Sequence, residues 1–462
     1  MQPVDNYKKK RWIVIIWSLV LAGVAISLSL NKSVWLDEAL TLRWTSMPWS
    51  EMMEHLVADV HPPLYYIVLK VFSFISPGSI ALGKACAILC YVLTMLIGGL
   101  FLQKYFSTAS AFFFTLFTTA IPMMLVKTVE IRMYTMTMFF MVLTAIFMYK
   151  IIYNRDSKLN WACFVLFGVA TAYTHYYGLL SMVFLYPMLL LYLIIDKDWK
   201  AVKKWFIYSS VTAIVYLPWL PIAINQVTAV NNDYWIDPQG LASYFKDLFR
   251  YDFFPHSTKI YCAILLLSGL YLLIQYIRKK EEKYYWSLAC MTPFIGVFSF
   301  AYLYGVLVRP IMVVRYLLPA LALLIFAASI VCGDINRWIT TVICLFLIVM
   351  ICFNYPLAFE NEYDTYTDKT MAFWEENIAE DASVFLTEGA LHAVIKYSFP
   401  QTELGSYQDL LSMTDKPEEF WILDVHDEFT ADRGKFADYE VEEYEDMGLD
   451  NMDFTIYHLK AR

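Results

Sequence analysis

Long apolar runs follow one another along the first three quarters of the chain. Most are about 17 to 25 residues long, and a helix of that length crosses the roughly 30 Å hydrocarbon core of a bilayer. Only 17 % of the 462 residues are charged, against about a quarter in soluble proteins. We therefore expect a polytopic α-helical membrane protein with about eleven transmembrane helices. The expected spans are 12–30, 80–101, 108–126, 134–152, 160–174, 177–195, 205–225, 258–277, 284–306, 314–332 and 337–354.

One further apolar run, 62–76, is not expected to cross the membrane. It begins with Pro62-Pro63, carries Lys70 in its middle and is short, so it fits a half-helix on or in the outer leaflet. With this choice the most basic loops fall on the side of the N-terminus, which the positive-inside rule assigns to the cytoplasm. The polar clusters described below then all lie on the outer side of the membrane.

The charge balance changes sign near Tyr355. Residues 1–354 carry 28 Lys and Arg and 17 Asp and Glu, a net +11, whereas residues 355–462 carry 7 and 26, a net −19. We expect a membrane domain over 1–354 and an acidic extracytoplasmic domain over 355–462, whose charge disfavours nucleic acid as a partner. The second domain alternates helix-like and strand-like stretches, which predicts a small α/β fold. The expected helices are 369–377 and 391–397, and the expected strands are 384–387, 420–424 and 454–459.

Two acid-containing motifs stand in the first outer loop, 31–63. The first contains Asp37 and Glu38, which begin an amphipathic helix, and the second runs from Asp59 and His61 through two prolines to Tyr65. Carboxylates beside a membrane are costly to keep near hydrocarbon, which favours a functional role. The alternatives are that the first pair only complements a helix dipole and that the second motif is only a rigid turn.

Three further outer segments carry polar residues. A short loop holds Glu130 and Arg132, a turn holds His175, and Arg309 and Arg315 bracket another loop. Arginines outside oppose the positive-inside bias, which favours a role in binding a phosphate. A solvated turn is the alternative for Glu130 and Arg132, and anchoring by the aromatic belt is the alternative for the turn around His175.

Several common site types are absent from the sequence. It contains no G-x-x-x-x-G-K-[ST], G-x-G-x-x-G, G-x-S-x-G or HExxH motif. All eight cysteines lie in or at the ends of apolar runs, so neither a disulfide framework nor a cysteine zinc site is expected. We predict no cofactor and no metal site.

The Asp-Glu pair, the motif DVHPPLYY and the later EIRMY and RYLLPAL together resemble the GT-C membrane glycosyltransferases. Within them the chain is similar to the family-39-like branch, which is related to dolichyl-phosphate-mannose protein mannosyltransferases and to the lipid A aminoarabinose transferase. The resemblance covers the membrane region. It implies a polyprenyl-phosphate sugar as donor, a hexose such as mannose or a pentose as the sugar, and an acceptor hydroxyl on a protein, glycolipid or cell-wall polymer.

The resemblance also implies roles for particular residues. Asp37 acts as general base, supported by Glu38 and assisted by Glu130, and in-line attack inverts the anomeric carbon. The expected residues for the donor phosphate or the acceptor are Arg43, Asp59, His61, Tyr65, Arg132, His175, Arg309 and Arg315. Some relatives use a divalent metal, but the absence of a clean ligand constellation here favours a metal-independent enzyme.

Two other functions compete with this hypothesis. A transporter or flippase for a lipid-linked sugar predicts charges in the middle of spans, and the spans here carry almost none. A scaffold that presents the acidic domain leaves the outer carboxylates and arginines without a role.

Overall fold

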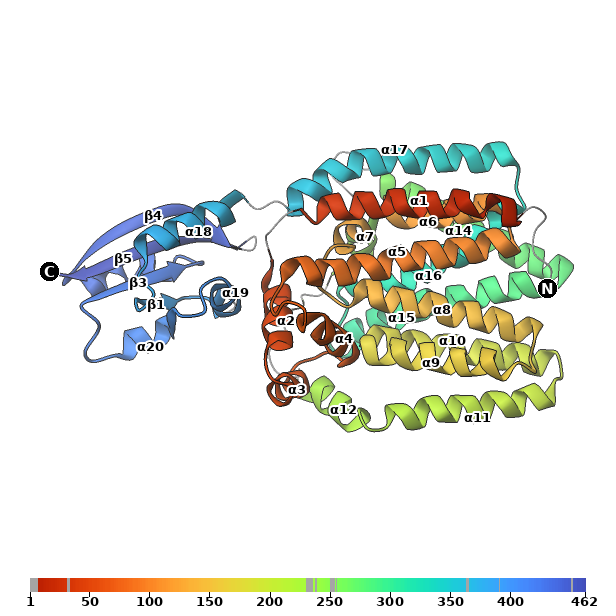
Figure 1. Ribbon diagram of the computed structural model, residues 1–462, viewed down its shortest axis with the longest axis horizontal. Helices are drawn as coiled ribbons and strands as arrows, with labels where there is room; N and C mark the ends of the chain where they lie inside the picture. The colour runs from red at the N-terminus through yellow and green to blue at the C-terminus, as the bar shows by residue number, and fades with distance from the viewer. Residues whose placement is uncertain are drawn as a thin grey trace.

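The computed structural model describes residues 7–30, 34–229, 236, 239–249, 254, 256–362, 365–389, 391–449 and 452–462. Its two parts are a bundle of roughly parallel and antiparallel helices and a smaller domain with a β-sheet at one end of that bundle (Figure 1). The chain is therefore a multi-pass helical membrane protein with a C-terminal sheet domain, as the sequence predicts.

Every apolar run expected to span the membrane forms helix. The helices are α1 (Tyr7–Leu28), α5 (Ile80–Tyr105), α6 (Thr108–Ala120), α7 (Pro122–Lys127), α8 (Tyr134–Tyr153), α9 (Lys158–Thr174), α10 (Tyr176–Ile195), α11 (Trp199–Tyr216), α12 (Leu220–Ala229), α14 (Ser257–Lys279), α15 (Glu282–Leu307), η1 (Val314–Leu317), α16 (Leu318–Ala328), η2 (Ser329–Gly333) and α17 (Arg337–Glu362). A further short helix, α13 (Leu241–Phe249), precedes α14.

Not every one of these helices has the length of a full crossing. In the described part of the chain eight are long and apolar enough, and α11 with α12, bent by 62°, makes a ninth. Helix α6 has 13 residues and α9 has 17, or about 20 Å and 26 Å at 1.5 Å per residue, which is less than the hydrocarbon thickness. The eleven helical runs thus differ in whether they are long enough for a full crossing.

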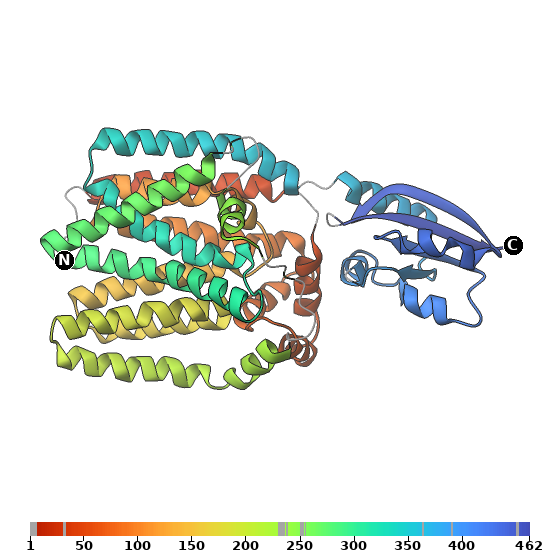
Figure 2. The ribbon, with the colours of Figure 1, turned by 180° about the vertical axis from the view of Figure 1, so that it is seen from behind.

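The bundle is layered from a buried centre to an apolar outside. In the most apolar stretch of Val314–Gly333, the segment that contains α16, 94 % is buried inside the protein. In the corresponding stretch of α17 only 22 % is buried. Helices α17 and α11 lie at opposite edges of the bundle in both views (Figures 1 and 2). Large exposed side chains on α17, such as Trp338 and Val342, are apolar, as expected where a helix faces lipid.

The first outer loop is a folded unit of three helices, α2 (Leu36–Ser46), α3 (Trp49–Ala58) and α4 (Leu64–Ser73). Helix α4 covers the run 62–76 and has only 10 residues, so it is too short to cross. The Lys70 ammonium donates to the carbonyl oxygen of Met47, and the Ser73 hydroxyl donates to that of Thr45 at 3.0 Å. These bonds fix α4 against the end of α2.

The C-terminal domain has one five-stranded sheet, in the order β2-β1-β3-β5-β4. Strands β1, β2 and β3 are parallel, and β5 pairs antiparallel with β3 and β4. The sequence predicts β1, β3, β5 and the two longer helices, but not the outermost strands β2 and β4. The elements are α18 (Thr365–Asn377), β1 (Ser383–Leu386), α19 (Leu391–Ser398), β2 (Glu403–Ser406), α20 (Tyr407–Ser412), β3 (Glu419–Asp424), α21 (Glu428–Asp432), η3 (Arg433–Phe436), β4 (Tyr439–Leu449) and β5 (Met452–Ala461).

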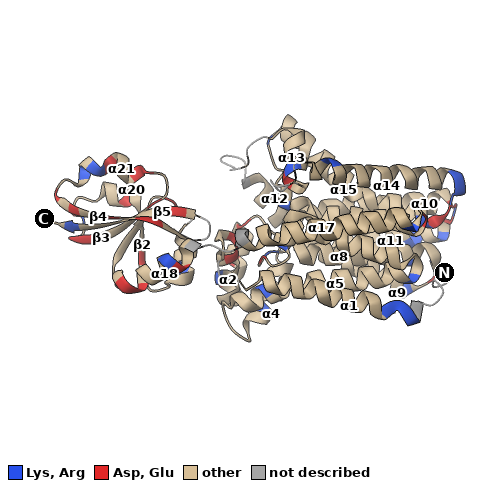
Figure 3. Ribbon diagram, turned by 90° about the horizontal axis from the view of Figure 1, so that it is seen from above, with Lys and Arg blue, Asp and Glu red and all other residues tan. Residues whose placement is uncertain are grey.

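The change in composition at Tyr355 lies inside a helix. Helix α17 continues through this point to Glu362, because Leu357, Ala358 and Phe359 extend its apolar side. The first element packed on the sheet is α18, where the Thr370 hydroxyl accepts a hydrogen bond from the backbone N–H of Gly448 at 2.9 Å. Asp and Glu are numerous in the sheet domain, and many Lys and Arg lie at the end of the helix bundle that is far from this domain (Figure 3).

Candidate functional site

Side chains from distant parts of the chain meet where α2 faces the loop before α8 and the loop before α16. At their centre is Asp37, in the first turn of α2. Its Oδ2 lies 3.6 Å from Nη2 of Arg132 and 3.8 Å from Nη2 of Arg315. The Asp37 side chain is 26 % exposed, so a ligand can reach it. Two guanidinium groups beside one accessible carboxylate define the site.

Glu38 has a different environment from its neighbour. Its side chain is buried, Oε1 accepts a hydrogen bond from the backbone N–H of Ile131 at 2.6 Å, and Oε2 accepts one from Trp35 at 3.2 Å. The second bond closes the first turn of α2, and the first bond joins α2 to the loop before α8. Both carboxylate oxygens of Glu38 thus accept hydrogen bonds from backbone N–H groups.

Arg132 is buried and holds several groups of the first outer loop. Its Nη1 donates to the backbone oxygen of Asp37 at 3.2 Å and to the Thr41 hydroxyl at 3.1 Å, with the Tyr66 hydroxyl at 3.5 Å. Its Nη2 donates to Nε2 of His61 at 3.2 Å. The guanidinium thus orients α2, in addition to placing positive charge beside Asp37.

The contact with Arg132 fixes the protonation of His61. A guanidinium can only donate, so Nε2 of His61 must accept, and the proton is on Nδ1. That N–H donates to Oδ2 of Asp59 at 2.9 Å. Burial raises the pKa of Asp59, but the hydrogen bond from His61 and the positive charge of Arg132 outweigh it and lower the pKa below its usual value. Asp59, His61 and Arg132 form one hydrogen-bonded chain that ends beside Asp37.

His175 offers a neutral donor next to this chain. Its Nδ1 accepts from the backbone N–H of Tyr177 at 3.0 Å, so its proton is on Nε2, which is buried and has no hydrogen-bond partner among the described residues. Burial, together with the positive charges of Arg132 and Arg315, holds the pKa of His175 well below 6.5. His175 therefore stays neutral near pH 7.

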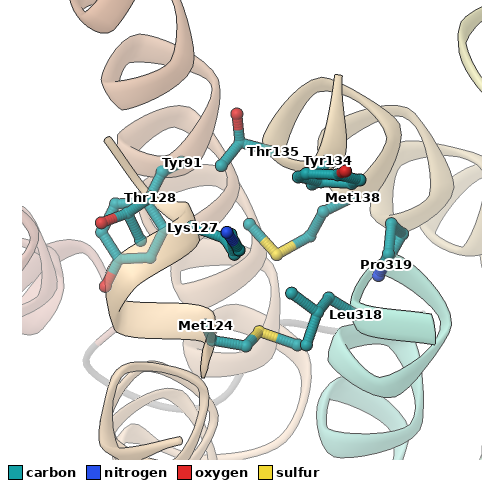
Figure 4. Close-up of a pocket in the computed structure, with 9 residues that line it drawn as sticks. All are labelled: Tyr91, Met124, Lys127, Thr128, Tyr134, Thr135, Met138, Leu318 and Pro319. Atoms are coloured by element: carbon teal, nitrogen blue, oxygen red, sulfur yellow. The ribbon is translucent and has the colours of Figure 1, made fainter. Parts of the chain in front are cut away.

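Arg315 and Lys127 approach the ring of Trp35, at 5.1 Å and 5.2 Å from its centroid. Lys127 forms an ion pair with Glu130. Figure 4 shows Lys127 among Tyr91, Met138 and Leu318, around a void of about 10 Å³ that holds roughly one water molecule. Glu130 is thus buried, with its carboxylate paired to Lys127.

A cavity of about 530 Å³ opens beside the site, between α10, α12 and α15. Its walls are mostly apolar, and its polar lining includes His61, His175, Arg309 and Tyr316. Arg309 donates from Nη2 to the backbone oxygen of Val227 at 2.8 Å. The cavity combines mostly apolar walls with several polar side chains, a composition suited to a lipid with a charged head.

Two predicted residues lie apart from Asp37. Arg43 faces α19 of the C-terminal domain, where it lines another cavity with Lys396. Tyr65 is fully buried in α4, and its hydroxyl has no partner among the described residues. Sequence reasoning missed Tyr66, Thr41, Trp35, Lys127 and Tyr316. The only signal for Tyr66 was its place beside Tyr65.

Among the described residues, no group of three or more His, Cys, Asp or Glu side chains is arranged to hold a metal ion. The positive charge near Asp37 comes from arginine side chains.

No family model and no curated protein matches the sequence. Solved structures match by fold. ArnT from Cupriavidus metallidurans bound to undecaprenyl phosphate aligns with a TM-score of 0.68 over 97 % of this chain and 98 % of its own, at 11 % identity. The apo state of that protein gives a TM-score of 0.64 at 11 % identity over 98 % of both chains.

A second solved protein is also similar. Oligosaccharyltransferase AglB from Archaeoglobus fulgidus, in complex with an inhibitory peptide and a dolichol-phosphate, aligns with a TM-score of 0.51 at 11 % identity. This match covers 87 % of the present chain and 65 % of AglB. At these identities the likeness concerns the fold alone: the chain shares the fold of ArnT over nearly its whole length.

Proposed function

We propose that this chain is a membrane glycosyltransferase that moves a sugar from a polyprenyl-phosphate donor to an acceptor hydroxyl. The observation that carries the proposal is the Asp37 carboxylate, held between Arg132 and Arg315 next to a cavity with apolar walls. Support also comes from the structure of similar fold that is bound to undecaprenyl phosphate.

The donor lipid occupies the cavity between α10, α12 and α15 in this proposal. Its chain contacts apolar side chains such as Leu180 and Phe300, and its phosphate lies near His175 and Arg309. Arg315, 3.8 Å from Asp37, completes the cationic surroundings of the phosphate. Guanidinium groups suit this task because they bind phosphate oxygens with two parallel donors.

The transfer step uses Asp37 as general base. Asp37 removes the proton of the acceptor hydroxyl, and the oxygen attacks the anomeric carbon as the bond to the phosphate oxygen breaks. The lipid phosphate leaves with the electron pair, and Arg315, Arg309 and His175 stabilise its charge. In-line attack inverts the anomeric centre. Arg132 and Glu38 hold Asp37 in place.

The proposal includes an orientation and a sugar. The N-terminus lies in the cytoplasm, and the site and the sheet domain lie outside, because Lys and Arg gather at the end of the bundle far from the sheet domain. The sugar is a hexose or pentose, with mannose as the first candidate, and the acceptor is a protein, glycolipid or cell-wall polymer. The enzyme works without a metal cofactor.

The test is sugar transfer in isolated membranes with radiolabelled polyprenyl-phosphate hexose. Wild type is expected to consume donor. The Asp37→Asn variant, present in equal amount, is expected not to consume it. A flippase would instead move labelled lipid across the membrane without breaking its glycosyl bond, and equal movement by both proteins without consumption would contradict the enzyme proposal.

A further inference from the structure

A second cavity, of about 420 Å³, lies between the membrane part and the C-terminal domain. One wall is formed by Arg43 and Ser46 of α2 with Met47, which directly follows that helix. The other wall is formed by Lys396 and Tyr397 of α19 with Pro400 of the following loop. Each wall contributes one cation, and none of these six lining residues is acidic. Helices α2 and α19 are neighbours in Figure 1.

The position of these cations is unexpected for this domain. Residues 355–462 hold 26 Asp and Glu and only 7 Lys and Arg, yet one of the few lysines faces an arginine of the membrane part. His392, one helical turn before Lys396, is part of the same surface: burial and then the charges of Arg43 and Lys396 lower its pKa. Like charges that face each other across an interface are unfavourable unless an anion lies between them.

The contact between α2 and α19 is well packed, so the cavity is a fixed feature of it. Leu391 and Ile395 of α19 share a buried apolar cluster with Ala39 and Leu42 of α2. The Tyr397 hydroxyl donates to the backbone oxygen of Gly78 at 2.5 Å.

The two cations differ in how they are held. The Lys396 ammonium donates to the backbone oxygen of Thr402 at 2.6 Å and to that of Pro400 at 3.3 Å. These two bonds hold the Lys396 ammonium in place and use two of its three N–H donors. Arg43 makes no hydrogen bond or ion pair within the described part of the chain.

From this arrangement we infer that the cavity between α2 and α19 binds an oxyanion, a phosphate or a carboxylate, carried by the acceptor. The assignment of this anion to the acceptor rests on the proposed function, whereas the anion site itself does not. Arg43 follows Asp37 by six residues on α2, which is about 9 Å along the helix axis and about 120° around it. The acceptor therefore places its reacting hydroxyl at Asp37 while its anionic group is bound one to two helical turns away.

The first experiment measures anion binding to the full chain in detergent at constant ionic strength. Inorganic phosphate and acetate are titrated in separate arms after saturation with undecaprenyl phosphate, and binding is followed by calorimetry. The double variant Arg43→Gln/Lys396→Gln is compared with Arg433→Gln/Lys416→Gln, which removes the same charge from the C-terminal domain away from the cavity. We expect the first variant to bind the preferred anion about fivefold or more weakly than wild type, and the control to bind it as wild type does.

The second experiment follows the products of donor consumption in membranes. If the acceptor is held at this cavity, Arg43→Gln/Lys396→Gln releases more label as free sugar and less as transferred sugar, because water replaces the acceptor. Damage to the fold would lower both products together. Equal anion affinity in the two double variants, or no anion binding by wild type, overturns the inference. Failure of wild type to consume donor counts against the proposed function. The anion site is then judged by the calorimetric titration alone.

Discussion

The carboxylate of Glu38 lies 2.6 Å from the backbone nitrogen of Ile131, 93 residues later in the chain. Asp37 and Arg132 are the sequence neighbours of these two residues. This buried hydrogen bond, with those that Arg132 donates to α2, therefore sets the approach of the accessible carboxylate to the buried guanidinium. Hydrogen bonds with a charged partner are stronger than neutral ones, so this contact suits a role in fixing two outer loops.

Asp37→Asn is expected to reduce sugar transfer by about 100- to 10,000-fold, the range for loss of a general base. Initial rates in membranes, with donor in excess, measure the effect. Glu51→Gln is the control, because Glu51 is an exposed carboxylate of the same outer loop. A rate for Asp37→Asn within a factor of about two of that for Glu51→Gln would remove the base role.

Glu38→Ala is expected to act on stability. It leaves the buried N–H group of Ile131 and the partly buried one of Trp35 without their acceptor, at a cost of about 2 to 4 kcal/mol. Thermal unfolding in detergent should show a lower Tm for Glu38→Ala and a smaller decrease for Glu38→Gln, which keeps one acceptor oxygen. Asp37→Asn should leave the Tm near that of wild type. Equal Tm values for wild type and Glu38→Ala would contradict the positioning role.

The contribution of Asp59 to stability is expected to depend on pH. Its folded pKa is lowered, so its charged form stabilises the fold fully above the unfolded pKa, about 3.9, and this stabilisation is lost as pH falls through the folded value. The Tm difference between wild type and Asp59→Asn should be constant from about pH 5 to 7 and shrink below about pH 4. A difference that grows on acidification would reverse the assigned direction.

His175 is expected to contribute a neutral hydrogen-bond donor. His175→Phe should weaken binding of undecaprenyl phosphate by about tenfold, and His175→Gln should keep most of the affinity because its amide also donates. Because the pKa of His175 is held well below 6.5, the difference between wild type and His175→Phe should not change between about pH 6 and 8. A difference that increases as pH falls in this range would mean that His175 binds as a cation.

Filling the cavity between α10, α12 and α15 is expected to block the donor. Val183 lines the cavity and is 56 % exposed, so Val183→Trp adds bulk there without overpacking the core. Binding of undecaprenyl phosphate should weaken about tenfold or more as apolar contact area is lost. Leu266→Trp is the control, since Leu266 on α14 is 65 % exposed and lies outside the lining of this cavity. Similar affinity in the two variants would place the lipid elsewhere.

The apolar pattern predicts the fold well because burial in lipid or in a core requires apolar side chains. The eleven runs all form helix, and β1, β3 and β5 are the sheet's inner strands. Strands β2 and β4 are its edges, and β4 carries glutamates on its exposed positions, such as Glu440 and Glu443. An edge strand with one solvated face has no continuous apolar pattern to detect.

The composition of the site is harder to read from sequence than its location. The shared outer side of the polar segments anticipates that Arg132 and Arg315 meet Asp37. Arg43 turns away because six residues on a helix rotate it by about 120° relative to Asp37. Glu130 pairs with Lys127, three residues earlier, and that contact depends on where α7 ends. The spacing of residues in the sequence alone predicts neither the direction in which Arg43 points nor the point at which α7 ends.

The walls of the 530 Å³ cavity include Val183, Ile224 and Val227, all more than half exposed. Exposed apolar side chains at a cavity wall are expected where the cavity opens sideways, toward the acyl chains of the surrounding leaflet. A lipid that enters by this route never leaves the bilayer and arrives by diffusion in two dimensions. Its supply is then set by its mole fraction among membrane lipids, and any apparent KM for it in detergent will rise as micelles dilute it.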